Sequence, residues 1–133
     1  MPSLIADFQE AVRTKNAGLN ADLIADDVRL YGMLWEPIVG KETVLSVLNM
    51  MLQLIEDLEF VAEYEGADGV VLHIRGRVDG RPFDGAQLVR FNDEILIDEI
   101  RNLVRPHSAG AALVDVATEY LSRKLQDPDS QGT

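Results

Sequence analysis

The sequence predicts an α+β fold in which a bent antiparallel sheet packs on three to four helices. Three observations predict it. Four strand-like segments follow one another between Leu58 and Pro106, amphipathic helical patterns flank them, and a hairpin turn sets their register. At 133 residues the chain is long enough to bury one hydrophobic core. We therefore expect a single domain over residues 1–125 and a disordered tail over residues 126–133.

The hairpin at Asp79-Gly80 determines which side chains face the core. Asp-Gly is a strong signal for a two-residue turn, because both central residues of that turn need a positive φ. Such a turn places Leu72 opposite Gln87 on the next strand. Because Leu72 belongs to an apolar face, Gln87 is a polar side chain directed at the core, and a buried polar group needs a partner.

The neighbouring strands are assigned by the same alternation of faces. The side chains expected to face the core from the preceding strand are Leu58, Phe60, Ala62 and Tyr64, with outward glutamates facing outward arginines. A four-residue loop at 92–95 would direct a second set to the core: Leu96, Asp98, Ile100, Asn102 and Val104. A loop of three or five residues would invert this last assignment. The opposite face of the last strand is half apolar, which indicates contact with a second subunit.

Helical patterns surround the sheet on both sides in the sequence. The expected elements are, in order, a helix from about Ser3 to Gly18, a short helix from Asn20 to Ala25, a strand from Val28 to Met33, a helix from Lys41 to about Asp57, the four strands, and a helix after Pro106. The long middle helix has a wide apolar surface, so we expect it to pack firmly on the sheet.

The composition excludes several classes of function. The formal charge is −11 and there is no basic cluster, so nucleic acid and anionic membrane surfaces are poor partners. There is no cysteine, which excludes disulfides and thiolate chemistry and fits a cytoplasmic location. No apolar run is long enough to cross a bilayer. His73 and His107 stand far apart without the spacing of metal ligands, so no metal and no cofactor is expected.

Four short motifs and the order of the elements resemble a known superfamily. The motifs are Ala25-Asp26-Asp27-Val28, Glu36-Pro37 with Gly40, Gly85 to Phe91, and Val104-Arg105-Pro106. Together they resemble the nuclear transport factor 2-like superfamily, and within it the SnoaL-like polyketide cyclases, with ketosteroid isomerase and limonene-epoxide hydrolase as more distant members. The resemblance covers nearly the whole chain. It implies a conical sheet closing on helices around an apolar cavity, usually in a homodimer built through the outer sheet face.

The resemblance also shows that the catalytic residues of these relatives are replaced here. Gly32 stands where ketosteroid isomerases have a general-base aspartate, and Phe8 stands where they have an oxyanion-hole tyrosine. Gln87 replaces their oxyanion-hole acid, and its amide can donate a hydrogen bond but cannot ionise. The last-strand acid of epoxide hydrolases aligns with Asn102, and the histidine and aspartate of cyclase-like members fall on Ile100 and Asn102.

These observations lead to three hypotheses. The first is a binding module for a small hydrophobic molecule, in a cavity lined by Phe8, Leu30, Trp35, Leu52, Phe60, Gln87, Ile100 and Asn102. The second is a cyclase, isomerase or hydratase acting on a polyketide, steroid or terpenoid, with Asp98 as the base. The third is a dimeric accessory protein whose cavity is filled by its own side chains. Two alternatives stay open: Trp35 either lines the cavity or fills the core, and Gln87 and Asn102 either hydrogen-bond each other or contact the ligand.

Overall fold

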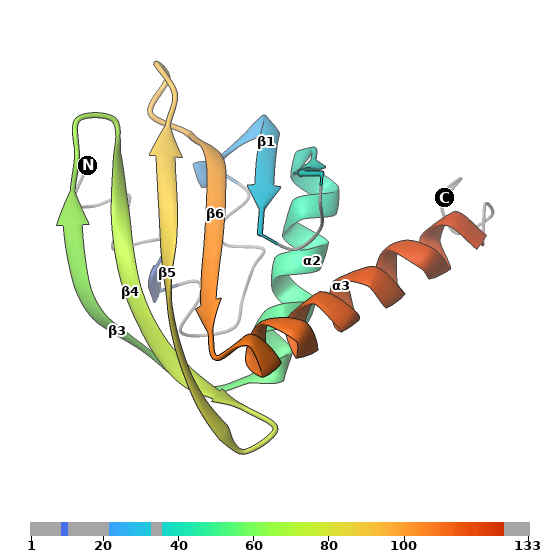
Figure 1. Cartoon of the computed structure of the whole chain (residues 1–133). Helices are drawn as coiled ribbons and strands as arrows, with labels where there is room; N and C mark the ends of the chain where they lie inside the picture. Colours follow the sequence, from blue (N-terminus) through green and yellow to red (C-terminus); the bar gives the residue numbers. More distant parts are fainter. Residues whose placement is uncertain (1–8, 11–21, 33–35, 127–133) are drawn as a thin grey trace.

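A computed structural model describes residues 9–10, 22–32 and 36–126 of the chain (Figure 1). The elements are β1 (Ile24–Tyr31), β2 (Ile38–Val39), α2 (Lys41–Leu54), β3 (Ile55–Glu65), β4 (Gly69–Val78), β5 (Arg81–Phe91), β6 (Ile97–Arg105) and α3 (His107–Gln126). Residues 9–10 are helical. Most of the expected first helix, part of the expected second helix and residues 127–133 lie outside the described residues. No helix in the described ranges is long and apolar enough to cross a membrane.

The strands form one curved, open sheet of six strands in the order β2-β1-β6-β5-β4-β3. Four of the five neighbouring pairs are antiparallel, whereas β1 and β6 run parallel. Helix α2 packs on one face of this sheet, and α3 begins beside α2 and β6 before it runs away from the sheet (Figure 1). The predicted α+β architecture is confirmed. The parallel pair and the short β2 were not predicted.

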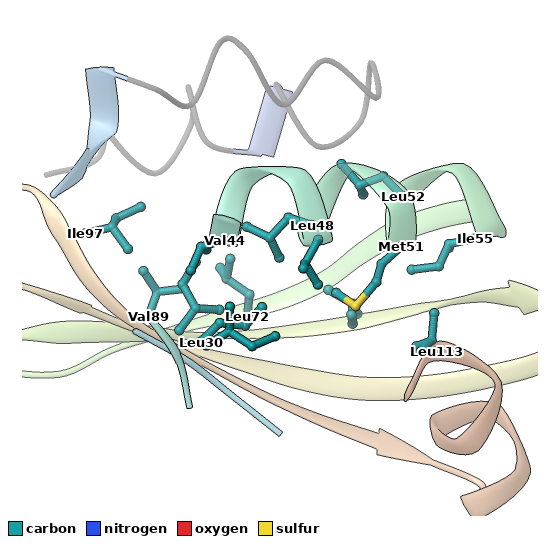
Figure 2. Packing of buried hydrophobic residues seen from close by; sticks show 14 of the residues in the cluster. Leu30, Val44, Leu48, Met51, Leu52, Ile55, Leu72, Val89, Ile97 and Leu113 are labelled. Atoms are coloured by element: carbon teal, nitrogen blue, oxygen red, sulfur yellow. The ribbon is translucent and has the colours of Figure 1, made fainter. Parts of the chain in front are cut away.

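The hydrophobic core lies between α2 and the inner face of the sheet. Figure 2 shows Leu48 and Met51 of α2 above Leu30, Leu72 and Val89 of the strands. Leu30 and Leu72 are completely buried, and α2 contributes two further buried valines. Burial of one such leucine stabilises the folded state by about 1.5–3 kcal/mol. The expectation that the long middle helix packs firmly on the sheet is therefore confirmed.

Two element boundaries differ from the prediction. Helix α2 ends at Leu54, and β3 begins at the next residue, although the helix was expected to continue to about Asp57. Asp57 has a φ of 56°, which a helix does not allow. At the start of the sheet, β1 begins at Ile24 rather than at Val28, so the expected second helix cannot extend to Ala25. In both places, apolar residues whose spacing fits a helix belong to a strand in the structure.

The hairpin between β4 and β5 has the predicted register. Leu72 pairs with Gln87 and Ile74 pairs with Gly85. The turn residues Asp79 and Gly80 have φ values of 54° and 73°, as a two-residue turn of this type requires. The Asp-Gly dipeptide therefore correctly placed Gln87 on the inner face.

Strand β3 departs from the predicted alternation after Phe60. Phe60 pairs with Ile74 on the inner face, but the register shifts at the next residue, so Tyr64 pairs with the outward Val71. The Tyr64 side chain is 62% exposed. The prediction that Ala62 and Tyr64 face the core is wrong, because a bulge inserts one residue and inverts the facing of everything beyond it. The expectation that outward glutamates of this strand face outward arginines is met at Glu59, whose Oε1 atom accepts a hydrogen bond from Arg75 Nε over 3.0 Å.

The connection between β5 and β6 runs from residue 92 to residue 96, one residue longer than expected. As a result Ile97, and neither Leu96 nor Asp98, takes the buried position at the start of β6, with no exposed surface. The prediction that Leu96 and Asp98 face the core is therefore wrong.

A bulge then restores the predicted facing for the rest of β6. Arg90 pairs with Glu99 and Phe91 pairs with Ile97, which leaves Asp98 as the extra residue. Beyond it, Ile100 is completely buried and Asn102 is 8% exposed, as expected for the inner face. The longer loop and the bulge each shift the alternation by one residue, so their effects cancel from Ile100 onward.

Candidate functional site

Two amide side chains lie next to each other on the apolar inner face of the sheet. Gln87 of β5 and Asn102 of β6 are direct cross-strand partners. The next inner pair along these strands is Val89 with Ile100, and both side chains are buried and apolar. Because the register is set by the Asp-Gly turn and by the bulge in β6, strand pairing brings the two amides together.

Both amide oxygens are buried without a hydrogen-bond partner. The Oε1 atom of Gln87 and the Oδ1 atom of Asn102 accept no hydrogen bond, and no bond joins the two side chains within the part of the chain that the structure describes. A buried oxygen left in this state costs roughly 1–3 kcal/mol. Of the two alternatives for this pair, mutual hydrogen bonding is not observed, so the oxygens are free to accept from another molecule.

A pocket of about 400 Å³ lies beside Asn102, between β6, the end of β1 and the first half of α3. Its walls include Gly32, Asn102, Val104, His107, Leu113 and Asp115. Gly32 has a φ of 106°, and a Cβ atom there would lie 2.3 Å from the backbone oxygen of Asn102. The absence of a side chain at residue 32 therefore lets the end of β1 lie directly against β6 at the pocket.

Most other residues predicted to line the cavity belong to the core. Leu30 and Ile100 have no exposed surface, and Leu52 is 7% exposed. Phe60 is partly buried and packs against this core. Phe8 and Trp35 lie outside the described residues, so the alternatives for Trp35 stay open. The structure thus brings together Gln87, Ile100 and Asn102 and shows the aliphatic members of the set as packing residues.

The sequence analysis missed the α3 side of the pocket. Leu113 and Val114 line it from α3, and His107 and Asp115 are exposed on the same helix. The periodicity that predicted this helix marks Leu113 as a packed residue. It does not say that the helix leaves a space against β6, because that depends on the angle at which α3 leaves the sheet (Figure 1).

Asp98, the candidate base, is held by an arginine. The Arg90 Nε and Nη2 atoms donate to the two carboxylate oxygens of Asp98, each over 3.2 Å. The hydrogen bonds from Arg90 to Asp98, together with the nearby charges of Asp98 and Glu99, raise the pKa of the Arg90 guanidinium above its usual value. Since Arg90 follows the inward Val89 on β5, this ion pair lies on the outer face, away from the amides.

The outer face carries an ordered cluster of charges around Glu99. The Glu99 carboxylate is 12% exposed and accepts hydrogen bonds from Arg101 over 2.8 Å and from Arg29 over 3.4 Å. The Arg101 guanidinium lies 4.1 Å from the centroid of the Tyr31 ring, a cation–π geometry. The bulge makes this cluster possible, because it turns Glu99 toward arginines on both neighbouring strands.

The two histidines are not part of a metal site in the described structure. No group of three or more histidine, cysteine or acidic side chains in the described ranges could hold a metal ion. The bulge in β3 places Ala62 opposite His73, and the His73 Nε2 atom lies 3.6 Å from Asp84 Oδ2 on the other neighbouring strand.

Solved structures with a similar fold are known for this chain, although no protein-family model and no curated protein matches its sequence. Among solved structures, an uncharacterized bacterial protein with a cystatin-like fold from Silicibacter pomeroyi is 23% identical, with 95% of this chain and 92% of that chain covered and a TM-score of 0.84. A steroid delta-isomerase from Pseudomonas aeruginosa is 25% identical, with coverages of 94% and 93% and a TM-score of 0.83.

A third structure carries the superfamily's name. An NTF2-like protein of unknown function from Cytophaga hutchinsonii is 16% identical, covering 79% of this chain and 89% of that chain with a TM-score of 0.64. All three have the same fold as this chain over most of their length. The predicted resemblance to the nuclear transport factor 2-like superfamily is therefore confirmed, and the chain has the α+β cone fold of that superfamily.

Proposed function

We propose that this chain is a SnoaL-like binding protein that holds a small hydrophobic molecule against the inner face of its sheet. The observation that carries the proposal is the pair of unpartnered amide oxygens on Gln87 and Asn102, within an otherwise apolar surface. Ligand sites are typically apolar with a few polar groups that orient the ligand. The pocket beside Asn102 supplies the space.

Isomerase chemistry is the second candidate function, because a steroid delta-isomerase is among the similar structures. The described residues support it less well than binding. Asp98 is paired with Arg90, and the carboxylate that lines the pocket, Asp115, is exposed on α3. A general base in such enzymes must reach the substrate carbon, and a perturbed carboxylate needs burial or a like-charged neighbour. Among the described residues, the buried side-chain polar atoms without a partner are the amide oxygens of Gln87 and Asn102, and both amides are neutral.

We predict that Asn102→Leu abolishes ligand binding and makes the free protein more stable. Leucine has nearly the shape of asparagine, and it removes a buried oxygen without a partner, so the free energy of unfolding should rise by about 1 kcal/mol. Native mass spectrometry of the purified proteins would show a small molecule bound to the wild type and absent from the variant. Chemical denaturation would measure the change in stability.

The matched control for this variant is Asn49→Leu. Asn49 is exposed on α2, so the same substitution there should leave both ligand occupancy and stability unchanged. If Asn102→Leu destabilised the protein and kept the bound mass, Asn102 would be a structural residue and the proposal would be wrong. A wild-type protein that bound no small molecule in ligand screens would also contradict it.

The functional unit that we propose is a homodimer formed through the outer sheet face. Tyr64 and Leu103 are exposed on that face by 62% and 59%. Tyr64 lies on β3 and Leu103 on β6, with β4 and β5 between them, so the two mark a broad outer surface rather than one compact patch. The organised arginines and acids around Glu99 would give such a contact its polar part.

Leu103→Lys should convert this dimer to monomer. A lysine on the interface would bring a charge into a contact that excludes water, which costs several kilocalories per mole. Size-exclusion chromatography and native mass spectrometry would report the subunit number. Ile95→Lys is the control, because Ile95 is 51% exposed but lies in the 92–96 turn rather than on a strand. A wild type that is monomeric at high concentration would exclude the dimer.

A further inference from the structure

We infer that the pocket beside Asn102 takes a hydrophobic molecule with a cationic head group, such as a protonated amine, and holds the charge at Asp115. This inference rests on the proposed binding function and names the chemical class of its ligand. The apolar body of the molecule would lie between α3 and β6, with the ammonium group at the rim. A neutral alcohol of the same shape would bind more weakly, and a carboxylate would bind most weakly.

The pocket exists because the side of α3 that lines it has small residues at its centre. The α3 residues in its wall are His107, Gly110, Ala111, Leu113, Val114 and Asp115. A Cβ atom on Gly110 would already lie 3.9 Å from the backbone oxygen of Val104, so a longer side chain there would fill the space. From the sheet the wall includes Asn102, which is more than nine-tenths buried and whose oxygen accepts no hydrogen bond from the described residues. The middle of the pocket thus has room for the apolar body of a ligand beside one neutral amide.

Asp115 brings to this pocket a carboxylate that no other described residue neutralises. It is exposed on α3 and forms no ion pair within the described part of the chain. On the outer sheet face, by contrast, Asp84 and Glu99 are each bound by an arginine over 2.8 Å. No lysine or arginine is among the described residues that line the pocket. A ligand with a positive charge would supply the counter-charge that Asp115 lacks.

The surroundings of the pocket do not offset this negative charge. His107, the first residue of α3, lies about 12 Å from Asp115 along the helix axis, at a rise of about 1.5 Å per residue. Arg105, just before the helix, is bound to Asp84 on the outer face. The chain as a whole carries a formal charge of −11, which attracts cations and repels anions. Local and overall charge therefore favour the same kind of ligand.

The exposure of Asp115 sets the size of the expected preference. An ion pair that water reaches contributes little, and it changes an affinity by a factor of about two to five. Salt weakens such a pair, because charges are screened beyond roughly 3 Å at an ionic strength of about 1 M. The apolar contacts with α3 and β6 are not screened by salt. The expected signature is a preference for the amine that disappears in salt while the alcohol still binds.

Three probes with the same phenylbutyl body test the inference: 4-phenylbutylamine, 4-phenylbutanol and 4-phenylbutyrate. They differ in the head group, which is positive, neutral or negative at pH 7. Ligand-observed NMR titration of the full-length protein gives their dissociation constants at low salt and in about 1 M sodium chloride. At low salt we expect the amine to bind about three- to fivefold more tightly than the alcohol, and the butyrate to bind more weakly than either. In high salt the amine and the alcohol should bind alike.

Three variants assign the effect to this pocket. Asp115→Asn keeps the shape of the side chain and should bring the amine to the affinity of the alcohol. Glu119→Gln is the matched control, because it removes the same charge from an exposed position of α3 that is not among the described residues lining the pocket. Ala111→Leu places a larger side chain at an exposed position of the pocket wall and should weaken the binding of all three probes. Circular dichroism and the unfolding midpoint would confirm that each variant retains the fold.

The possible outcomes separate this inference from the proposed function. If the wild type binds the amine and the alcohol equally at low salt, the pocket binds hydrophobic molecules without selecting a charge, and the inference alone is wrong. Tightest binding of the butyrate would also overturn it. A preference for the amine that persists in Asp115→Asn would assign the preference to the overall charge and contradict the role of Asp115. Binding that Ala111→Leu leaves intact would place the ligand outside this pocket and contradict the inference. If none of the three probes binds at millimolar concentration, the proposed binding function fails along with it.

Discussion

We expect Gly32→Ala to lower the free energy of unfolding by about 3–4 kcal/mol, the largest effect of any substitution considered. Gly32 has a φ of 106°, where an L-residue is strained. In addition, its new Cβ atom would lie 2.3 Å from the backbone oxygen of Asn102, a distance that no packing adjustment of a side chain can relieve. The backbone of β6 or the end of β1 would have to move. Urea denaturation followed by circular dichroism would measure the loss.

Gly40→Ala is a closely matched control for this substitution. Gly40 has a φ of 105°, but a Cβ atom there would meet nothing within 4 Å. It should therefore show only the backbone strain, about 1–2 kcal/mol. The difference between the two variants isolates the clash with Asn102. Equal losses in the two variants would mean that β1 and β6 separate easily at this point.

The close approach of Gly32 to the Asn102 backbone also bears on the absence of a catalytic base at residue 32. The resemblance to ketosteroid isomerases places their general-base aspartate at the position of Gly32. An aspartate here would carry the same Cβ atom that collides with the Asn102 backbone. The end of β1 is thus built around a residue without a side chain. Restoring isomerase chemistry would take a rearranged β1 as well as a new carboxylate, which supports binding over catalysis as the proposed function.

Local signals predicted the central part of the candidate site. The Asp-Gly dipeptide set the register of β4 and β5 because few residues tolerate two successive positive φ values. From that register Gln87 follows on the inner face, and its pairing with Asn102 is observed. Gln87 could be recognised in the sequence because it is a polar residue in an otherwise apolar alternation, and the proposed function depends on it.

The two bulges could not be predicted from alternation, because their sequences fit both registers. At the start of β6, Leu96 and Ile97 are both apolar, so either could occupy the buried position. In β3, Val61, Ala62 and Tyr64 are all compatible with a half-buried strand. A bulge inserts one residue and inverts the facing beyond it. The α3 wall of the pocket was missed for another reason, since it depends on how a helix lies in space.

The bulge in β6 leads to a second strong prediction: Glu99→Gln should destabilise the fold by roughly 2 kcal/mol. The Glu99 carboxylate is 12% exposed and receives hydrogen bonds from Arg101 and Arg29, while Arg90 Nη2 lies 4.0 Å away. Glutamine keeps the shape and removes the charge, so neighbouring guanidinium groups repel one another without their central anion. The effect is smaller than for a fully buried pair because the arginines are partly hydrated. Thermal and urea unfolding would measure it.

Glu59→Gln is the control, since Glu59 also receives two hydrogen bonds from an arginine but is exposed. Its side chain is 57% exposed, and hydrogen bonds and charge from Arg75 lower its pKa below the usual 4.5. This contribution to stability is complete above pH 4.5 and is lost as the pH falls through the lowered pKa. Exposed pairs contribute little, so the variant should unfold nearly like the wild type at pH 7.

The comparison of the two glutamates also tests the proposed dimer. If the outer face is an interface, the Glu99 cluster is covered by the second subunit, and loss of its central anion should weaken association as well as folding. Glu99→Gln should then shift the protein toward monomer at low concentration, and more strongly than Glu59→Gln, whose ion pair with Arg75 is exposed. A Glu99→Gln protein that is as stable as Glu59→Gln would show that the arginines reach water freely. In that case the cluster would be an ordinary hydrated surface, and the outer face would lose the polar half of its proposed contact.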